Sequence, residues 1–412
     1  MHLCLFEDDG SHHLHRHLHP LTLTRTAGDL RVGARTLIEK QIAAFPYAGR
    51  VVLWTRPELA DVTRQEYPDV LVNEMPTGPT LLINQQWLVR EGGLFETVQN
   101  AVKADQNVRA WEQGDIVFAV WLPEGPSASI NQTVQDALDT NDYTECVEGE
   151  VLIYCLPDLI ADVPERAAYD IERMGNLGEH LGTIQPGALL VLPERIHIAE
   201  RTVIRPGAVL NAQDGPTHIA AGATVEENAL VRGPVFLGGN SFIKAGARID
   251  GSAIGPGCKV GGEIHESIFH SYSNKAHGGY LGNSYLGRWC NLGAGTNTSN
   301  LKNDYGEISV FDAVAGDFLP SGRQFAGLFM GDHSKCSINT MFNTGTVVGV
   351  FCNLFGGGFP PRHVPSFSWG SPDVSYQLDK AIRVAETVMA RRGIALTEAD
   401  RALLSSVFEH SR

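Results

Sequence analysis

The stretch IHIAERTVIRPGAVLNAQD (Ile196–Asp214) decides the fold of the C-terminal half of the chain. Aliphatic residues recur in it about every six positions, and small or turn-forming residues follow them. One inward aliphatic side chain per six residues is typical of a parallel β-helix, in which three flat faces make one triangular coil. Small residues are needed where the chain turns each corner. A Gly-rich set of hairpins would instead alternate with period two.

The same register continues beyond this stretch as IAAGAT, VEENAL, LGGNSF, IKAGAR, IDGSAI, IGPGCK and VGGEIH. We therefore expect a left-handed parallel β-helix over residues 183–360. The tail over residues 361–412 should contain two helices, Pro372–Arg391 and Thr397–His410, with Asp373 capping the first. These helices can cap the end of the stack, because a β-helix exposes its last coil.

Residues 1–165 have a different pattern, in which short apolar runs alternate with helical spacing. The runs expected as buried strands are Val51–Trp54, Thr80–Asn84, Asp115–Leu122 and Val151–Leu156. Helices are expected at Ala34–Phe45 and Leu94–Ala104, and residues 166–182 should form a helical linker. Such alternation indicates an α/β domain with a mostly parallel sheet.

Composition limits the partners and the location. The formal net charge of −15 disfavours nucleic acid, which requires a basic face. No run of eighteen apolar residues is present, and acidic residues occupy the opening MHLCLFEDDG where a signal peptide needs basic ones. The seven cysteines are odd in number and never spaced C-x-x-C. We therefore expect no nucleic-acid or membrane partner, and a cytoplasmic location with reduced thiols.

The periodicity fails at HGGY (His277–Tyr280) and at NTSNLKNDYG (Asn297–Gly306), so these segments should leave the coil as loops. A histidine with a pKa near 7 can take a proton from an amine that attacks a thioester, which makes His277 a candidate base. The alternative is that His277 only packs. Amide groups for a sugar are offered by Asn291 and Asn300, and a phosphate could bind Arg248 or Lys275.

The motifs KAHGGYLG (Lys275–Gly282) and NLGAGTNTSN (Asn291–Asn300) resemble one bacterial bifunctional family. That family combines glucosamine-1-phosphate N-acetyltransferase with N-acetylglucosamine-1-phosphate uridylyltransferase in UDP-N-acetylglucosamine synthesis. The resemblance implies that His277 is the catalytic base and that Tyr280 contacts the substrate. It further implies that Asn291 and Asn300 bind the sugar, and that Arg248 binds its phosphate.

The resemblance also implies acetyl-CoA as co-substrate and a homotrimer, with Ser337 and Asn339 near the CoA groove between subunits. One departure is that the family's second phosphate-binding lysine falls near His265 or Glu266. Lys302 is a candidate substitute for it.

The segment His17–Gln41 resembles the opening of sugar nucleotidyltransferases, which implies a Rossmann-like domain that uses Mg²⁺ and a nucleoside triphosphate. The Gly-rich loop of that family is replaced by FEDDGSHHLHR, in which Gly10 is the only glycine. In register, the loop arginine falls on His17, the lysine on Ala27 and the metal-binding aspartate near Gln85. Candidate nucleotide-binding residues are Arg25, Arg31, Lys40 and Asn84. The metal ligands are unknown, although Glu7, Asp8 and Asp9 are acidic candidates.

The whole chain resembles a divergent branch of the bifunctional family with a short N-terminal domain. The leading hypothesis is an acetyltransferase joined to a sugar-1-phosphate nucleotidyltransferase. A second is an acyltransferase for another amino sugar, whose N-terminal domain binds nucleotide without turnover. A third, of another class, is a trimeric β-helix scaffold without activity.

Overall fold

The computed structural model describes residues 1–8, 13–104, 107–114, 116–139, 144–146 and 148–411; Asp9 and Gly10 lie outside them. The chain divides into two compact units. The first consists of Met1–Leu18, Thr24–Leu30 and Thr36–Tyr154, and the second of His19–Leu23, Arg31–Arg35 and Cys155–Arg412. Over the described residues, none of the helices has the length and apolar character that crossing a membrane requires.

The first unit is built on a seven-stranded sheet in the order β5-β4-β1-β6-β8-β7-β9. Its strands are β1 (His2–Phe6), β4 (Arg50–Trp54), β5 (Leu71–Val72), β6 (Thr80–Asn84), β7 (Arg109–Gln113), β8 (Ile116–Leu122) and β9 (Thr144–Cys146). The four strands β5, β4, β1 and β6 are parallel, and β8 is antiparallel to both of its neighbours. The α/β fold predicted for this part of the chain is confirmed.

Helices cover both faces of this sheet. They are α1 (Leu37–Ala44), α2 (Ala60–Glu66), α3 (Gly93–Ala104) and α4 (Ile130–Asp139). Along β1, Leu3 and Leu5 belong to one buried cluster while Cys4 and Phe6 belong to the other. This alternation is expected of a strand buried on both faces. The predicted strand Val151–Leu156 is wrong, because within it only Leu152 makes an isolated bridge and the last residue begins a helix.

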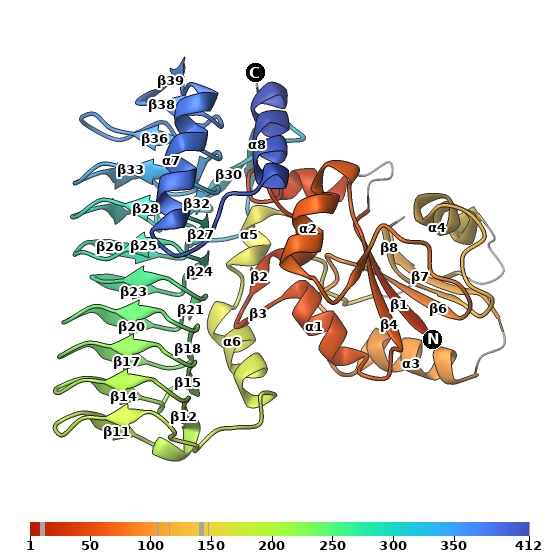
Figure 1. Ribbon diagram of the computed structural model, residues 1–412, viewed down its shortest axis with the longest axis horizontal. Coiled ribbons are helices and arrows are strands. Elements are labelled where there is room, and N and C mark those ends of the chain that lie inside the picture. The colour runs from red at the N-terminus through yellow and green to blue at the C-terminus, as the bar shows by residue number, and fades with distance from the viewer. Residues whose placement is uncertain (9–12, 105–106, 115, 140–143, 147, 412) are drawn as a thin grey trace. The chain divides into compact units, whose positions relative to one another are not determined.

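The second unit is a left-handed parallel β-helix with three faces, as predicted (Figure 1). Face 1 contains β10 (Thr183–Ile184), β13 (Val203–Ile204), β16 (Thr224–Val225), β19 (Phe242–Ile243), β22 (Lys259–Val260), β25 (Asn274–Lys275), β28 (Asn291–Leu292), β33 (Lys335–Cys336), β36 (Asn353–Leu354), β38 (Ser368–Trp369) and β39 (Ser371–Ser375). Only its last pair, β38 and β39, is antiparallel within the described part of this face.

Face 2 contains β11 (Leu189–Val191), β14 (Val209–Asn211), β17 (Leu230–Arg232), β20 (Arg248–Asp250), β23 (Glu263–His265) and β26 (Tyr280–Gly282), followed by the pair β29 (Asn297–Thr298) and β34 (Met341–Phe342). Face 3 contains β12 (Ile196–Ile198), β15 (Thr217–Ile219), β18 (Val235–Leu237), β21 (Ala253–Ile254), β24 (Ile268–Ser271), β27 (Tyr285–Arg288), β32 (Leu328–Met330), β35 (Thr346–Val348) and β37 (His363–Val364). Because successive coils pair in register, equivalent residues form columns.

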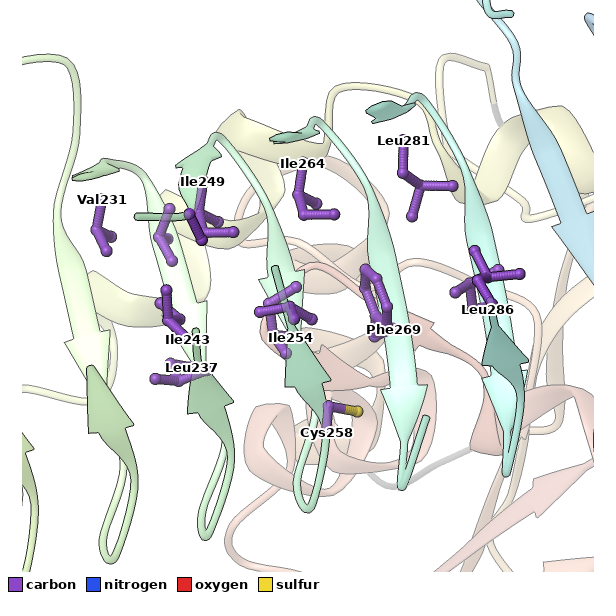
Figure 2. Close-up of a cluster of buried hydrophobic side chains, with 14 of the residues drawn as sticks. Val231, Leu237, Ile243, Ile249, Ile254, Cys258, Ile264, Phe269, Leu281 and Leu286 are labelled. Atoms are coloured by element: carbon purple, nitrogen blue, oxygen red, sulfur yellow. The ribbon is translucent and has the colours of Figure 1, made fainter. Parts of the chain in front are cut away.

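The hexapeptide aliphatic residues form the core of this unit. Figure 2 shows Val231, Ile249 and Ile264 in one column, each from the next coil along. All three are fully buried. Phe269 occupies an equivalent inward position on face 3, so the interior also accommodates an aromatic ring.

A ladder of aromatic rings follows the corner between face 3 and face 1. Its members, each with a positive φ, are Tyr272, Trp289, His333, Phe351 and Phe367. Successive ring centroids are 4.4, 6.1, 4.5 and 5.3 Å apart and the rings are stacked. Left-handed backbone is unfavourable for bulky residues, and stacking offsets part of that cost.

The C-terminal helices lie against the side of the coils rather than over their end (Figure 1). They are α7 (Leu378–Ala390) and α8 (Glu398–His410). Arg392 donates to the Gly257 carbonyl (3.0 Å) and to Asn274 Oδ1 (2.9 Å), both in middle coils. The prediction that Asp373 caps the first helix is wrong, since Gln377 holds that position.

Two segments of the second unit leave the coils. The connection before the β-helix contains α5 (Leu156–Leu159) and α6 (Val163–Glu172). Residues 299–327, which we call the arm, leave between β29 and β32 and contain the hairpin β30 (Ser309–Asp312) and β31 (Asp317–Pro320). The loop predicted at NTSNLKNDYG is confirmed from Ser299 onward, where the arm begins, whereas Asn297–Thr298 form β29 within the coil.

Candidate functional site

His277 lies at the corner between face 1 and face 2, in the short turn from β25 to β26, and its side chain is exposed. Within the described residues, no side chain forms a hydrogen bond with the imidazole. The ring can therefore meet a substrate directly, and its orientation depends on what binds beside it.

Lys275 supports the turn from inside. It pairs with Val260 in the column that also holds Ile243, so it occupies an inward aliphatic position of face 1. Its side chain is 1% exposed, and Nζ donates to the carbonyl oxygens of His277 (2.9 Å) and Gly278 (3.2 Å). Burial lowers its pKa to about 8. This enclosed ammonium does not suit the predicted phosphate contact; it holds the backbone of the His277 turn.

The glycine pair after His277 has two different environments. Gly279 has a φ of +113°, and a Cβ there would meet the Thr296 carbonyl oxygen at 2.1 Å, so the stacking of coils requires glycine. Gly278 has open space around its Cα. Close approach of a substrate to the backbone is therefore possible at Gly278.

The structure brings together Tyr280 and Asn300, two residues that the family resemblance implies as substrate contacts. Asn300 Nδ2 donates to Tyr280 Oη (3.1 Å) and to Asn283 Oδ1 (2.7 Å). Asn283 Nδ2 in turn donates to Glu266 Oε2 (3.0 Å). Burial raises the pKa of the Tyr280 phenol, which keeps it protonated and able to donate. Asn283 was not among the predicted residues. It lies at a corner of the coil with a positive φ, a backbone conformation that asparagine tolerates, and this preference is the one signal that the sequence offered.

The remaining predicted phosphate cations have protein partners. Arg248 Nε donates to Asp250 Oδ2 (2.9 Å), and its Nη1 lies 3.8 Å from Glu263 Oε1. Lys302 Nζ donates to the Glu307 carbonyl within the arm. Both cations are therefore engaged by protein groups and are not positioned to bind a phosphate dianion.

Asn291 lies on face 1, exposed and in register with Asn274 and Lys335. It is on the opposite side of the His277 corner from Tyr280, which begins β26 of face 2. The predicted sugar-binding residues therefore flank the base on two faces.

Ser337 and Asn339, predicted near the CoA groove, lie at the same corner as His277, beside β33 and β34. Asn339 N donates to the Ala294 carbonyl (2.7 Å), and its Oδ1 lies 2.2 Å from where a Cβ on Gly295 would stand. Asn339 has a φ of +55°. It thus has a structural role in the turn. The half-buried Ser337 hydroxyl donates to the Ile338 carbonyl (3.4 Å) and lies 3.4 Å from Thr340 Oγ1.

In the first unit, protein groups fill the edge of the sheet where the parallel strands end. Glu7, directly after β1, is buried and accepts from Arg56 Nε (3.0 Å), Thr55 Oγ1 (3.0 Å) and Ala27 N (2.9 Å). Burial by itself would raise the pKa of Glu7, but the Arg56 and His15 charges and these hydrogen bonds lower it overall. Glu7 is therefore a paired structural carboxylate.

Gln85 follows β6, where a metal-binding aspartate was expected. Its Nε2 donates to the Leu5 carbonyl (3.0 Å) and its Oε1 accepts from Gly28 N (3.1 Å) and Thr26 Oγ1. These bonds fix the short helix η2 (Ala27–Asp29) against the sheet edge. Within the described residues, no three His, Cys, Asp or Glu side chains are grouped to hold a metal. The described residues at this sheet edge therefore do not fit a Mg²⁺ site.

The predicted nucleotide-binding residues are not gathered around one opening. Asn84 is fully buried, donating to the Val117 carbonyl (2.9 Å) and accepting from Gln86 N (2.9 Å). Arg25 is buried 3.7 Å from Asp29, and Lys40 is buried on α1. Arg31 belongs to the second unit, where its guanidinium lies over the Phe236 ring.

Comparisons with known proteins agree with the two resemblances seen in the sequence, to sugar nucleotidyltransferases and to the bifunctional acetyltransferase family. Residues 3–174 match the sequence model of the family described as "Sugar nucleotidyl transferase". A bifunctional sugar-1-phosphate nucleotidylyltransferase/acetyltransferase of Sulfurisphaera tokodaii is 31% identical over 161 residues, which cover 34% of this chain and 40% of the relative. The bifunctional protein GlmU of Nitratidesulfovibrio vulgaris is 27% identical over 192 residues, 41% of this chain and 39% of the relative.

A solved structure is also similar, the UDP-N-acetylglucosamine acyltransferase from Campylobacter jejuni. It is 12% identical, covers 56% of this chain and 94% of that chain, and has a TM-score of 0.27. This likeness is too slight to bear on the fold, which the strand pairings establish. The chain spans about two fifths of the curated relatives described above. The predicted resemblance to the bifunctional family is confirmed.

Proposed function

We propose that the β-helix unit transfers an acetyl group from acetyl-CoA to the amine of an amino sugar. The observation that carries this proposal is the exposed His277 imidazole on a turn fixed by the buried Lys275 ammonium. Sugar-binding candidates flank it, with Asn291 on face 1 and the Tyr280–Asn300 pair on face 2. The activities for which the bifunctional relatives are named support the same chemistry.

In this mechanism the neutral His277 imidazole accepts a proton from the sugar amine as the nitrogen attacks the acetyl carbonyl. A C–N bond forms, the thioester C–S bond breaks, and the imidazolium returns the proton to the departing CoA thiolate. Tyr280, protonated at neutral pH, donates a hydrogen bond that fixes the ring. The scaffold hypothesis instead requires that replacing His277 changes no activity.

The first acceptor to consider is glucosamine-1-phosphate, which the sequence motifs imply. A second candidate is another amino sugar, and one observation favours it: the cations expected to hold the phosphate have other partners. Lys275 is enclosed by carbonyl groups, and Arg248 faces Asp250 and Glu263.

For the first unit, the leading proposal is exchange of the sugar phosphate onto a nucleoside triphosphate. The alternative is nucleotide binding without turnover. The filled sheet edge around Glu7 and Gln85 favours this alternative, because Gln85 lies where a metal-binding aspartate was expected and the Arg56 guanidinium is paired with Glu7. We further propose a homotrimer and a cytoplasmic location. The seven cysteines are all free in the structure, which supports the proposed location.

The test is release of free thiol from acetyl-CoA, with glucosamine-1-phosphate and glucosamine as acceptors. We expect turnover to fall by at least a hundredfold in His277→Ala and to stay unchanged in His410→Ala, a matched loss of an exposed histidine. Equal turnover in both variants would reject His277 as the base. No turnover with any amino sugar would favour the scaffold hypothesis.

A further inference from the structure

A cavity of about 470 Å³ lies within the second unit, and three separate segments form its walls. Residues 160–165, before and at the start of α6, form one wall, and Gly322–Phe325 of the arm form another. The floor is made by Glu266 and Asn283, which occupy the same corner of two successive coils between face 2 and face 3. Three segments far apart in sequence thus enclose a single space.

The first wall is seated tightly on the β-helix. A Cβ on Gly251, which has a φ of +54°, would lie 3.0 Å from Pro164 Cγ and 3.4 Å from Glu266 Cγ. The glycine therefore allows the connection to pack directly against the corner below it. This close packing holds the Asp162 side of the cavity at a fixed distance from the floor.

Most side chains that line the cavity are polar, and the apolar ones are Ile160, Pro164 and the aromatic Phe325. Carboxylates come from Asp162, Glu165 and Glu266, while the guanidinium of Arg323 is the single cationic group in the described lining. The ring of Phe325 is 44% exposed. Carboxylate oxygens accept hydrogen bonds from hydroxyl groups, and an aromatic ring packs against the apolar face of a sugar. A phosphate dianion would meet an excess of negative charge here.

The cavity is connected to the proposed acceptor residues by hydrogen bonds. Glu266 accepts from Asn283, Asn283 accepts from Asn300, and Asn300 also donates to the Tyr280 hydroxyl. The charge of Glu266 reaches the phenol, since it contributes to raising the Tyr280 pKa. A sugar in the cavity would therefore lie beside the groups that position the acceptor.

We propose that this cavity binds an uncharged sugar ring of the acceptor and selects against a phosphate at that position. Glu266 would accept from ring hydroxyls, Arg323 would donate to ring or hydroxyl oxygens, and Phe325 would stack on the ring. The inference rests on the proposed function only in naming this sugar as part of the acceptor.

Calorimetric titration of the full chain tests it with two probes, N-acetylglucosamine and N-acetylglucosamine-1-phosphate. We expect the native protein to bind the neutral sugar at least tenfold more tightly. Glu266→Lys should reverse that preference, because it replaces the carboxylate on the floor with an ammonium. Glu200→Lys, which makes the same charge change at an exposed position on another coil, should leave it unchanged. An equal preference in the native protein and Glu266→Lys would overturn the proposal.

Phe325→Ala gives a second test that does not alter charge, since the ring is partly exposed and its loss should not prevent folding. We expect it to weaken N-acetylglucosamine binding about tenfold while circular dichroism stays native. Unchanged binding would overturn the stacking contact and with it the cavity assignment. Sugar binding that responds to both variants without thiol release would keep this inference and reject the acetyl transfer. Thiol release at the native rate in both variants would instead keep the acetyl transfer and reject this inference.

Discussion

Replacing Lys275 with methionine should separate stability from activity. The change keeps the length of the side chain inside the coil but removes the ammonium that donates to the carbonyls of His277 and Gly278. Each hydrogen bond from a charged donor contributes about 1.5–3 kcal/mol, so the loss of two is roughly 3–6 kcal/mol. The burial that lowers the lysine pKa from 10.5 to about 8 costs the native protein about 3 kcal/mol at neutral pH.

These two quantities nearly cancel. We expect the free energy of unfolding of Lys275→Met at pH 7 to differ from the native value by no more than about 3 kcal/mol. The turn nevertheless loses its internal support, and a displacement of the base by about 1 Å lowers turnover about a hundredfold. The expected result is a folded protein with a low kcat and a KM close to native.

The pH dependence gives an independent check. The folded pKa of Lys275 is depressed, so the unfolded chain binds more protons between pH 8 and 10.5, and native stability rises with pH across that window. Lys335 has the same lowered pKa and adds to the rise in both proteins, so the difference between native and variant isolates Lys275. Urea unfolding at pH 7, 8 and 9.5 measures it.

Lys259→Met is the matched control, because it removes a lysine from the neighbouring coil that pairs with Asn274 on the outward side of face 1. We expect native turnover. Burial and the nearby Arg392 charge also lower the pKa of Lys259, so part of the rise in stability with pH should be lost in this variant, and turnover is the measurement that separates it from Lys275→Met. Full activity of Lys275→Met would refute the assignment of Lys275 as a positioning residue. A variant that lost several kcal/mol equally at every pH would refute the cancellation.

Two further predictions concern the folded units. Burial, with the nearby His197 and Arg35 charges, lowers the pKa of His218 from 6.5 to about 4, so native stability should be complete above pH 6.5 and fall by about 3 kcal/mol by pH 4. Urea unfolding of His218→Phe across this range should lack that dependence. A stability of the variant that falls with pH as steeply as that of the native protein would contradict the prediction. Glu7→Gln leaves Arg56 buried without its carboxylate and should destabilise the first unit by about 3 kcal/mol, without changing thiol release; calorimetry that shows no earlier transition would contradict it.

The β-helix could be predicted because its signal is repeated. Each of Ile243, Ile249 and Ile264 restates the same inward position, so no single ambiguous residue decides the outcome. The run Val151–Leu156 gave no such redundancy. A short apolar run cannot be told from a buried connection by its composition, and this one became a bridge and the start of a helix.

The site was partly predictable for the same reason. Tyr280 and Asn300 were singled out by the resemblance of their motifs to a known family, whereas Asn283 and Glu266 follow no hexapeptide rule and meet only when the coils stack. Lys275 had a signal that was missed: it lies six residues after Phe269 and six before Leu281, both inward aliphatic or aromatic positions of the repeat. A lysine at such a position cannot reach an outside phosphate, and its ammonium donates instead to backbone carbonyls of the corners, those of Gly261, His277 and Gly278.

The placement of the site on a corner bears on assembly. Side chains on two adjacent faces of a triangular coil point away from each other, so Asn291 on face 1 and Tyr280 on face 2 diverge from His277 between them. A convex corner cannot enclose a substrate or exclude water from it by itself. Within the described residues the His277 imidazole also has no side-chain partner to orient it. Both deficits are removed if a second copy of the chain packs its own coils against this corner, which is the arrangement that the proposed trimer would supply.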